Sequence, residues 1–220
     1  MYKFLVHSLI CFLMLAIMTG CNEKEPEVEE PPPPPPPSAQ EIHQEMRSAI
    51  GVLWRGGVSP QDRENLVNQL NQVKSRFNYE INAPEAIKRL EQDINDLVNQ
   101  AREAGRWGVV KGCAMAYKVL HPNSDRYNRI EERADMYLER PIVDVTGFME
   151  VDGVLYTFLR VSDPVSNRVE SYRVREGEEF HETNKYGITL RLLRVIGNQR
   201  AVEIEYKPLQ EPWEVPGPRQ

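Results

Sequence analysis

The chain has 220 residues, of which 33 are acidic and 27 are basic, so its formal net charge at pH 7 is −6. The two signs are interspersed and no stripe of lysine and arginine runs along the chain, which argues against a nucleic-acid-binding protein. The length is sufficient for one or two small domains, each with a hydrophobic core.

The N-terminal residues carry the most informative pattern in the sequence. A weakly basic start at Lys3 precedes an almost wholly apolar run, Phe4 to Met18, which leads through Thr19 and Gly20 to Cys21. The run is too short to span a membrane, because a spanning helix needs roughly 20 apolar residues. Its length and its exit through small residues are typical of a signal peptide.

The segment Leu15-Ala16-Ile17-Met18-Thr19-Gly20-Cys21 resembles the lipobox of bacterial lipoproteins. The resemblance implies that residues 1–20 are removed as a signal peptide and that Cys21 receives a diacylglycerol on its sulfur. It also implies that the new N-terminus is acylated. Several acyl chains would then hold the protein on a bacterial membrane, inner or outer, facing the periplasm or the outer surface. The alternative is an ordinary secretory signal whose cysteine is incidental.

Residues 21–37 are predicted to form a linker without a core. The stretch Asn22 to Glu30 carries five acids against one lysine, and seven consecutive prolines follow, Pro31 to Pro37. Consecutive prolines favour a polyproline II helix with a rise of about 3.1 Å per residue, so the tract would span roughly 20 Å. We interpret the linker as an acidic stalk that lifts a domain off an anionic membrane. The alternative is a ligand for an aromatic groove.

Residues 38–140 show the periodicity of amphipathic helices and are predicted to form a helical domain. Ser38 and Glu41 match a capping box, and Ser59-Pro60 matches a second helix start with proline in the first turn. Five helices are expected: from Ser38 to about Trp54, from Ser59 through Phe77, from Asn82 to Gly105, from about Trp107 to Leu120, and from Ser124 to Pro141.

The third and fourth expected helices resemble one tetratricopeptide-type unit. Their apolar residues fall on the slots of that repeat: Ile94, Leu97, Val98, Ala101, Val110, Ala114 and Tyr117, with Pro122 at the closing proline. Slots that normally hold glycine and two alanines are instead Val98, Val110 and Tyr117. A stacked array needs about three units. The block is therefore either a generic helical bundle or a repeat-like protein-binding surface.

Residues 141–216 change to the two-residue alternation of strands, and Asp152-Gly153 is a hairpin turn signal. Five strands are expected: Val143 to Val151, Val154 to Val161, Val169 to Val174, Ile188 to Ile196, and Ala201 to Tyr206. The predicted fold class is α+β, with a helical domain followed by a small five-stranded antiparallel β-barrel or sandwich. Residues 217–220 remain as a tail.

The β segment resembles the periplasmic domain of the type IV pilus assembly protein P family, which is related to the C component of type II secretion. The resemblance is carried by Gly153, the strand Tyr156 to Val161, the turn Ser162 to Asn167, the run Tyr172 to Phe180, Gly187, and the strands Ile188 to Val195 and Val202 to Tyr206. It implies a lipoprotein that aligns an envelope machine. Bacterial SH3-like domains, which contact peptidoglycan or peptides, show a similar pattern.

Cysteine chemistry is expected to be limited to lipidation. Cys11 leaves with the signal peptide and Cys21 is acylated, so Cys113 is alone in the mature chain and no intramolecular disulfide is expected. Cys113 lies in a stretch of small helix-forming residues, which favours a buried thiol that acts as a small hydrophobic group. The alternative is a reactive thiol.

The histidines do not predict a metal site. His43, His121 and His181 fall in separate elements, and no HExxH or CxxC spacing occurs, so neither a metal nor a cofactor is expected. His121 precedes Pro122 at a helix end, where a partial positive charge suits the helix dipole.

The acidic turn at Glu176, Glu178, Glu179 and Glu182 is expected to be solvated. Paired carboxylates for glycoside cleavage or a calcium site are the alternative. P-loop, Rossmann and nucleophile-elbow glycine patterns are absent from the sequence. We therefore expect no catalytic residues.

The remaining candidate is Trp213, in a proline-flanked C-terminal segment, which either packs back on the β-domain or contacts a partner. The sequence as a whole predicts a non-catalytic scaffold that binds envelope proteins, such as pilus or secretion components, through β edge strands or a helical groove. A lipoprotein that binds peptidoglycan or peptides through an SH3-like domain is the alternative. An enzyme is the third class, and it would require a deep pocket with paired carboxylates or a partnered histidine.

Overall fold

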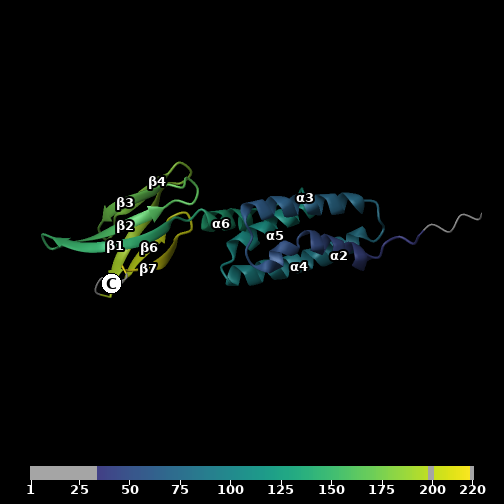
Figure 1. Cartoon of the computed structure of the whole chain (residues 1–220), viewed down its shortest axis with the longest axis horizontal. Coiled ribbons are helices and arrows are strands. Elements are labelled where there is room, and N and C mark those ends of the chain that lie inside the picture. The colour runs from purple at the N-terminus through teal and green to yellow at the C-terminus, as the bar shows by residue number, and fades with distance from the viewer. Residues whose placement is uncertain (1–33, 198–200, 219–220) are drawn as a thin grey trace, which may run out of the picture. The chain divides into compact units, whose positions relative to one another are not determined.

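The computed structural model describes residues 34–197 and 201–218 (Figure 1). The predicted signal peptide, the lipidation at Cys21 and most of the predicted linker lie outside these residues. In chain order the helices are α2 (Ala39–Ala49), the 3-10 helix η1 (Gly51–Arg55), α3 (Pro60–Arg76), α4 (Ala83–Glu103), α5 (Trp107–Leu120) and α6 (Asn128–Leu138). Among the described residues, no helix is both long enough and apolar enough to cross a membrane.

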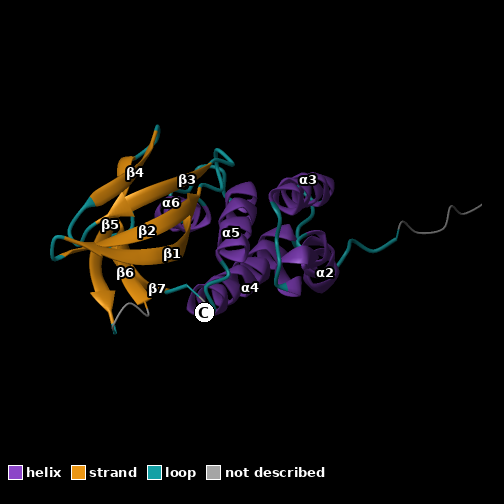
Figure 2. Cartoon of the chain, turned by 60° about the vertical axis from the view of Figure 1, so that its left-hand side comes forward, coloured by secondary structure: helices purple, strands orange, loops and turns teal. Residues whose placement is uncertain are grey.

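Within residues 34–197 and 201–218, seven strands follow the helices, which confirms the α+β class. They are β1 (Ile142–Val151), β2 (Val154–Ser162), β3 (Val169–Val174), β4 (Glu179–Thr183), β5 (Gly187–Ile196), β6 (Ala201–Tyr206) and β7 (Glu211–Pro216). They form two antiparallel sheets, one in the order β1-β2-β3 and the other in the order β4-β5-β6-β7 (Figure 2).

Two of the helix starts are set by capping boxes. The Ser38 backbone N–H donates to the Glu41 carboxylate at 2.7 Å, and the Glu41 N–H donates back to the Ser38 hydroxyl at 3.2 Å. Ser59 and Asp62 repeat this arrangement at α3, with distances of 3.0 and 3.1 Å. The hydrogen bonds from Ser38 hold the pKa of Glu41 below its ordinary value. Each box satisfies N–H groups that the first helical turn leaves without partners.

The structure corrects one expectation in the helical half and places Asn82 in an unexpected contact. The first helix does not continue to Trp54: α2 ends at Ala49, and a separate 3-10 helix follows up to Gly56, whose φ of 95° favours glycine. The Asn82 side chain does not cap α4. Its amide donates instead to the Pro37 carbonyl at 2.9 Å, so it fastens the end of the predicted linker to the helical half.

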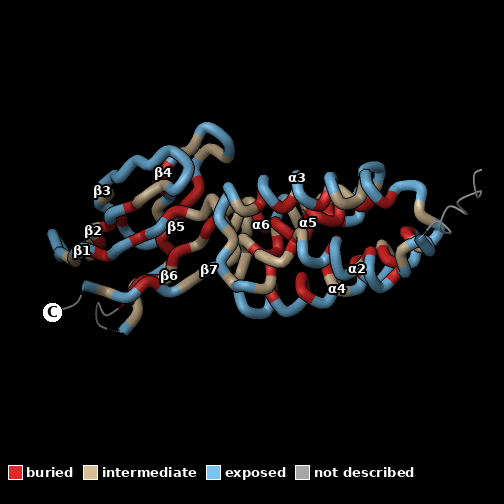
Figure 3. Tube along the Cα trace, turned by 45° about the vertical axis from the view of Figure 1, so that its right-hand side comes forward, coloured by how far each residue is buried: buried red, intermediate tan, exposed pale blue. Residues whose placement is uncertain are grey.

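Helix α5 lies at the centre of the helical half, where it contacts α3, α4 and α6. Small residues make this position accessible: a Cβ added at Gly112 would lie 2.6 Å from Leu53 Cδ2, and one added at Gly108 would lie 2.8 Å from the Val58 carbonyl oxygen. Cys113 is fully buried among these contacts, as expected for a small hydrophobic group. The buried residues shown in red in Figure 3 follow the facing sides of these helices.

The prediction of a five-stranded barrel is wrong in strand number and in closure, because the two sheets do not form one closed barrel. The sequence pattern missed β4 and β7. Strand β4 is short and acidic, with Phe180 as its one large apolar residue, and it forms through its hairpin with β5. Strand β7 contains Pro212 and Pro216, which are tolerated because β7 is an edge strand paired only with β6.

The β half has its own core, which joins inward-facing residues of both sheets. Its buried members are Val143, Val145, Leu159, Val161, Val174, Phe180, Leu190, Leu192, Val202, Ile204, Tyr206 and Val215. Met136 of α6 packs against this core. Helix α6 therefore contacts α5 on one side and the β half on the other.

The close approach at α5 predicts a position-specific effect of added volume. Gly108→Ala places a methyl group against a backbone carbonyl, which cannot rotate away as a side chain can, so we expect a loss of about 1–3 kcal/mol in the free energy of unfolding. Gly57→Ala is the matched control, because its added Cβ meets nothing within 4 Å. Urea denaturation of both variants measures the difference, and equal stabilities would contradict the packing argument.

Candidate functional site

A cleft of about 210 Å³ lies at the end of the β half that meets α6. It is bordered by the β2–β3 turn with the start of β3, by the β4–β5 hairpin, by the end of β6, and by the C-terminal cap residue of α6. The lining residues are Glu139, Asp163, Val165, Ser166, Arg168, Glu170, His181, Glu182, Thr183, Asn184, Lys185, Tyr186 and Tyr206. Ionisable groups from distant parts of the sequence are thus brought together at one place.

His181 is the most unusual residue of the cleft. Its side chain is only 4% exposed, and its φ of 61° places a non-glycine residue in the left-handed region. The β4–β5 register pairs Phe180 with Leu190 and Glu182 with Ile188. The Thr189 hydroxyl donates to the His181 carbonyl at 2.9 Å. Left-handed backbone at such residues is found disproportionately at functional sites, so the conformation directs attention to this side chain.

A chain of polar contacts orients the His181 ring. The Tyr172 hydroxyl donates to the Glu170 carboxylate, and the Tyr172 oxygen lies 3.3 Å from His181 Nδ1. Burial, and then the hydrogen bond to Glu170, raise the pKa of Tyr172, which keeps its proton. Because that single proton is directed to Glu170, the Tyr172 oxygen is the acceptor for Nδ1–H. This assignment leaves Nε2 of the neutral ring as a hydrogen-bond acceptor.

His181 Nε2 is buried and has no hydrogen-bond partner among the described residues. A buried polar atom without a partner is uncommon, since leaving it unpaired costs about 1–3 kcal/mol. His181 Nε2 is therefore a buried polar atom, with almost no accessible surface, that the rest of the described fold leaves unpaired.

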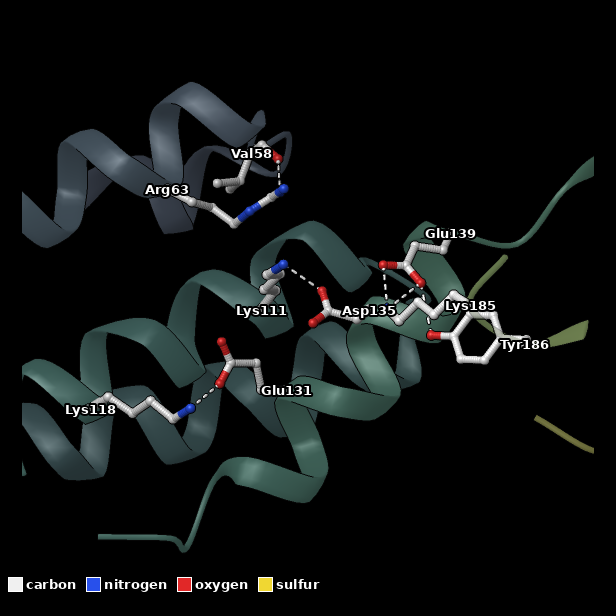
Figure 4. A network of polar contacts seen from close by, with 9 residues as sticks. All are labelled: Val58, Arg63, Lys111, Lys118, Glu131, Asp135, Glu139, Lys185 and Tyr186. Carbon is white, nitrogen blue, oxygen red and sulfur yellow. Dashed lines mark hydrogen bonds and ion pairs between the residues drawn. The ribbon is translucent and has the colours of Figure 1, made fainter. Parts of the chain in front are cut away.

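The edge of the cleft is held by Glu139, at the C-terminal cap of α6. Its carboxylate accepts from Lys185 Nζ at 2.7 and 2.8 Å and from the Tyr186 hydroxyl at 2.8 Å (Figure 4). The hydrogen bond to Glu139 raises the pKa of Lys185. These contacts fasten the β4–β5 turn to the end of α6.

Asp163 organises the opposite side of the cleft. Its carboxylate accepts from the Val165 N–H at 2.7 Å and from the Ser166 hydroxyl at 2.8 Å. Burial acts to raise the pKa of Asp163, but the hydrogen bonds from Ser166 and Val165 outweigh it and lower the pKa below its ordinary value. Asp163 is therefore ionised, and it fixes the turn between β2 and β3.

The cleft has an excess of negative charge. Four carboxylates border it, whereas Lys185 and Arg168 are its two permanently cationic side chains, and Lys185 is already paired with Glu139. A cationic group is therefore favoured over an anion in this place.

Trp213, the predicted partner contact, lies in β7 opposite Ile204 and packs against the β core. The Arg140 guanidinium lies 5.0 Å from the centre of its ring, within the range of a cation–π contact. The side chain is half-buried and faces a shallow groove that also includes Ile142 and Pro164. Contact with a partner stays a prediction for this residue.

The three histidines of the described residues are placed apart, as their positions in the sequence suggested. His43 Nε2 lies 3.0 Å from the Asp93 carboxylate. His121 caps the C-terminal end of α5, and its Nε2 lies 2.5 Å from the Glu91 carboxylate without hydrogen-bond alignment. Within residues 34–197 and 201–218, no group of three or more histidine, cysteine, aspartate or glutamate side chains is arranged to hold a metal ion.

The acidic turn is divided among separate partners. Glu176 accepts from the Val195 N–H at 2.7 Å, Glu178 pairs with Arg175, and Glu179 pairs with Lys207. Only Glu182 faces the cleft. The turn therefore does not form a pair of carboxylates of the kind that glycoside cleavage needs.

Sequence reasoning missed the cleft. Its one local signal is the spacing of Glu170 and Tyr172, which are two residues apart in β3 and so lie on one face of the strand. Their contact with His181 depends on how the sheets meet, which no spacing in the sequence states.

The chain matches no protein-family model, and comparisons with curated proteins and with solved structures also found no match.

The structure predicts an inert thiol at Cys113. Burial raises the pKa of Cys113 to about 12, so at about pH 9 its thiolate fraction should be lower than that of a free cysteine by about a thousandfold. We expect iodoacetamide to modify Cys113 in the native protein at least a thousand times more slowly than in urea. Mass spectrometry of the Cys113 peptide measures both rates, and similar rates would restore the reactive-thiol alternative.

Proposed function

We propose that this protein is a membrane-anchored, non-catalytic scaffold or adaptor of the bacterial envelope that binds another envelope protein. The single observation that carries the proposal is an exposed apolar face on the β1–β2 hairpin. In a protein that also has a membrane tether, such an exposed apolar face would serve for contact with another protein.

The end of this hairpin projects beyond its sheet. Strands β1 and β2 pair up to Val151 and Val154, whereas β3 pairs with β2 only between Thr157 and Ser162. The last part of the hairpin is therefore a two-stranded ribbon (Figure 1). A two-stranded ribbon alone is only marginally stable in water, so contact with a partner would stabilise it.

One face of the ribbon is apolar. Met149 pairs with Tyr156 and Val151 with Val154, and directly opposed residues of an antiparallel pair lie on the same face. Met149, Val151 and Val154 are 43%, 41% and 36% exposed. Contiguous apolar groups in water are characteristic of interaction surfaces. We name these three residues with Tyr156 the hairpin face.

The sheet edges support a face rather than an edge as the contact. Pro212 and Pro216 remove donors from β7, and a bulge interrupts the β1 register between Val145 and Gly147. Both features discourage the addition of another strand. The expected contact through an edge strand is therefore less favoured at β7 and in this part of β1 than contact through the hairpin face.

The tether supplies the rest of the proposed mechanism. Acylation at Cys21, the acidic polyproline linker and the TPR-like helical hairpin remain proposals from the sequence. A lipid anchor confines the hairpin face near the bilayer, which raises its effective concentration toward a membrane partner. The likeness to pilus and secretion alignment proteins supports a partner from such an assembly.

The second candidate function is that of a lipoprotein that binds peptidoglycan or peptides through its β-domain. The cleft at His181 favours it, because the cleft offers polar and ionised groups of a kind that recognise such ligands. Co-sedimentation with purified peptidoglycan tests this candidate directly.

The hairpin face predicts a directional crosslink. Benzoylphenylalanine at Val151 should give one defined crosslinked product in native membranes, whereas the same group at Glu150, on the opposite face, should give at least tenfold less. Immunoblotting and mass spectrometry quantify the product and identify the partner. Equal yields at the two positions, or no product from Val151, would remove the hairpin face from the proposal.

Lipidation predicts a change of fraction. Cys21→Ala should move the protein from the detergent-rich phase to the aqueous phase in a Triton X-114 partition, because the acyl chains provide the membrane anchor. Cys113→Ala is the matched control and should remain in the detergent-rich phase. If the Cys21→Ala protein stays there too, the lipoprotein reading is wrong.

A further inference from the structure

We propose that the groove beside Trp213 binds the proline tract, Pro31 to Pro37, of a second copy of this chain. Three observations carry the inference: an exposed apolar groove that contains a tryptophan, an arginine in it without an ion pair among the described residues, and a tract too short to reach the groove of its own chain. We name this feature the Trp213 groove. It is separate from the hairpin face and needs no lipid anchor, so this proposal and the proposed function fail independently.

The Trp213 groove presents apolar surface to water. It has a volume of about 430 Å³ and lies where the end of α6 and the start of β1 meet β7. Ile142 in this groove is 62% exposed, Pro164 and Pro216 are exposed, and Trp213 is half-buried. A tryptophan ring flanked by exposed apolar groups is the kind of surface that binds a proline-rich segment.

The proline tract has the conformation that such grooves bind. Consecutive prolines favour the polyproline II helix, whose backbone forms no internal hydrogen bonds. Aromatic-lined grooves recognise this helix because it is preformed and loses little conformational entropy when it docks. Within the described residues, Pro34, Pro35 and Pro36 are exposed and belong to no helix or strand. The chain therefore carries both a groove and a segment that suits it.

The charges of the linker and of the groove are complementary. Five acids and one lysine lie in Asn22 to Glu30, directly before Pro31. In the groove, the Arg140 guanidinium lies 5.0 Å from the centre of the Trp213 ring and forms no ion pair within residues 34–197 and 201–218. The lining also contains Glu214, which is exposed. A tract docked on Trp213 would bring the preceding glutamates toward Arg140, where a carboxylate is favoured.

The groove of the same chain is out of reach of the tract. The Pro37 carbonyl accepts from the Asn82 amide at 2.9 Å, at the first turn of α4. Tyr137 of the groove stacks on Trp107, which follows the other end of α4, with the ring centres 3.7 Å apart. Helix α4 has 21 residues and is therefore about 30 Å long. The tract spans only roughly 20 Å from Pro37, so its groove belongs to a second copy.

The first experiment measures binding of the tract as a peptide. The protein is residues 21–220 with Cys21→Ser, which contain every described residue, and with glycine and serine in place of Pro31 to Pro37 (the tractless chain). A peptide of residues 22–37 should bind saturably in isothermal titration calorimetry, and a peptide with glycine and serine in place of the prolines should bind at least tenfold more weakly. No saturable binding, or equal binding of the two peptides, would overturn the proposal.

The charge argument has its own variant in the same titration. Arg140→Gln should weaken binding of the proline peptide at least threefold, because the acidic residues before the tract lose their cationic partner. Arg129→Gln, which removes an exposed arginine of α6 outside the groove, is the matched control and should leave binding unchanged. An equal effect of the two substitutions would overturn the assignment of Arg140 to the site.

The second experiment tests whether the contact joins two copies. Ile142→Glu, in a chain that keeps its proline tract, blocks the groove with a negative charge at an exposed position that the core does not need. This variant and the tractless chain should each be monomeric in sedimentation equilibrium. An equimolar mixture should form a complex of one copy of each, because one supplies the tract and the other the groove.

The parent chain and a matched variant complete the second experiment. The parent, residues 21–220 with Cys21→Ser, should self-associate head to tail, since each copy has one tract and one groove. Val169→Glu, at a position of β3 that is 61% exposed and outside the groove, should self-associate as the parent does. A parent that stays monomeric at concentrations that saturate peptide binding, or a mixture without a complex, would overturn the proposal.

Discussion

Close packing of neighbouring elements against the small residues of α5 is the constraint on which the helical half depends. Three α-helices and the 3-10 helix η1 contact α5. Gly108 lets the Val58 carbonyl, and Gly112 lets the Leu53 side chain, approach to distances that a methyl group would block. Close packing of this kind leaves no room for adjustment, because protein interiors are filled as densely as organic crystals. Helix α6 is positioned on α5, and Glu139 at the end of α6 forms part of the cleft. The two glycines therefore set how closely η1 and α3 pack on α5, the helix on which α6 also packs.

Helix α6 divides its acidic residues between the two halves of the structure. Glu131, Asp135 and Glu139 are spaced four residues apart, so they follow one side of the helix. The first two pair with lysines of α5, and the third accepts from Lys185 and Tyr186 of the β half (Figure 4). Each exposed pair contributes little by itself, about 0–1 kcal/mol. These pairs set orientation more than stability, because together with the packing of Met136 they define how α6 contacts the β half.

The sequence predicted the elements whose signals are local. The helix from Trp107 to Leu120 has the predicted bounds, because its apolar spacing and Pro122 are both properties of the adjacent chain. Strands β4 and β7 were missed, since one is acidic and the other contains prolines, and each exists because a neighbouring strand pairs with it. The site was missed for the same reason: the contact of Tyr172 with His181 depends on tertiary packing. Helices and strands can therefore be predicted from adjacent residues, whereas a site that joins distant residues depends on tertiary packing.

The backbone of His181 stores conformational strain in the folded chain. A histidine in the left-handed region costs of order 1–3 kcal/mol relative to an unstrained residue, and asparagine or glycine adopts this conformation more easily. Directed evolution for heat resistance alone would thus tend to replace His181 and to lose the imidazole acceptor with it. A natural protein with histidine at such a position has a lower thermal stability than it could have with asparagine or glycine there. Selection for heat resistance in this fold would therefore act first on this one backbone position.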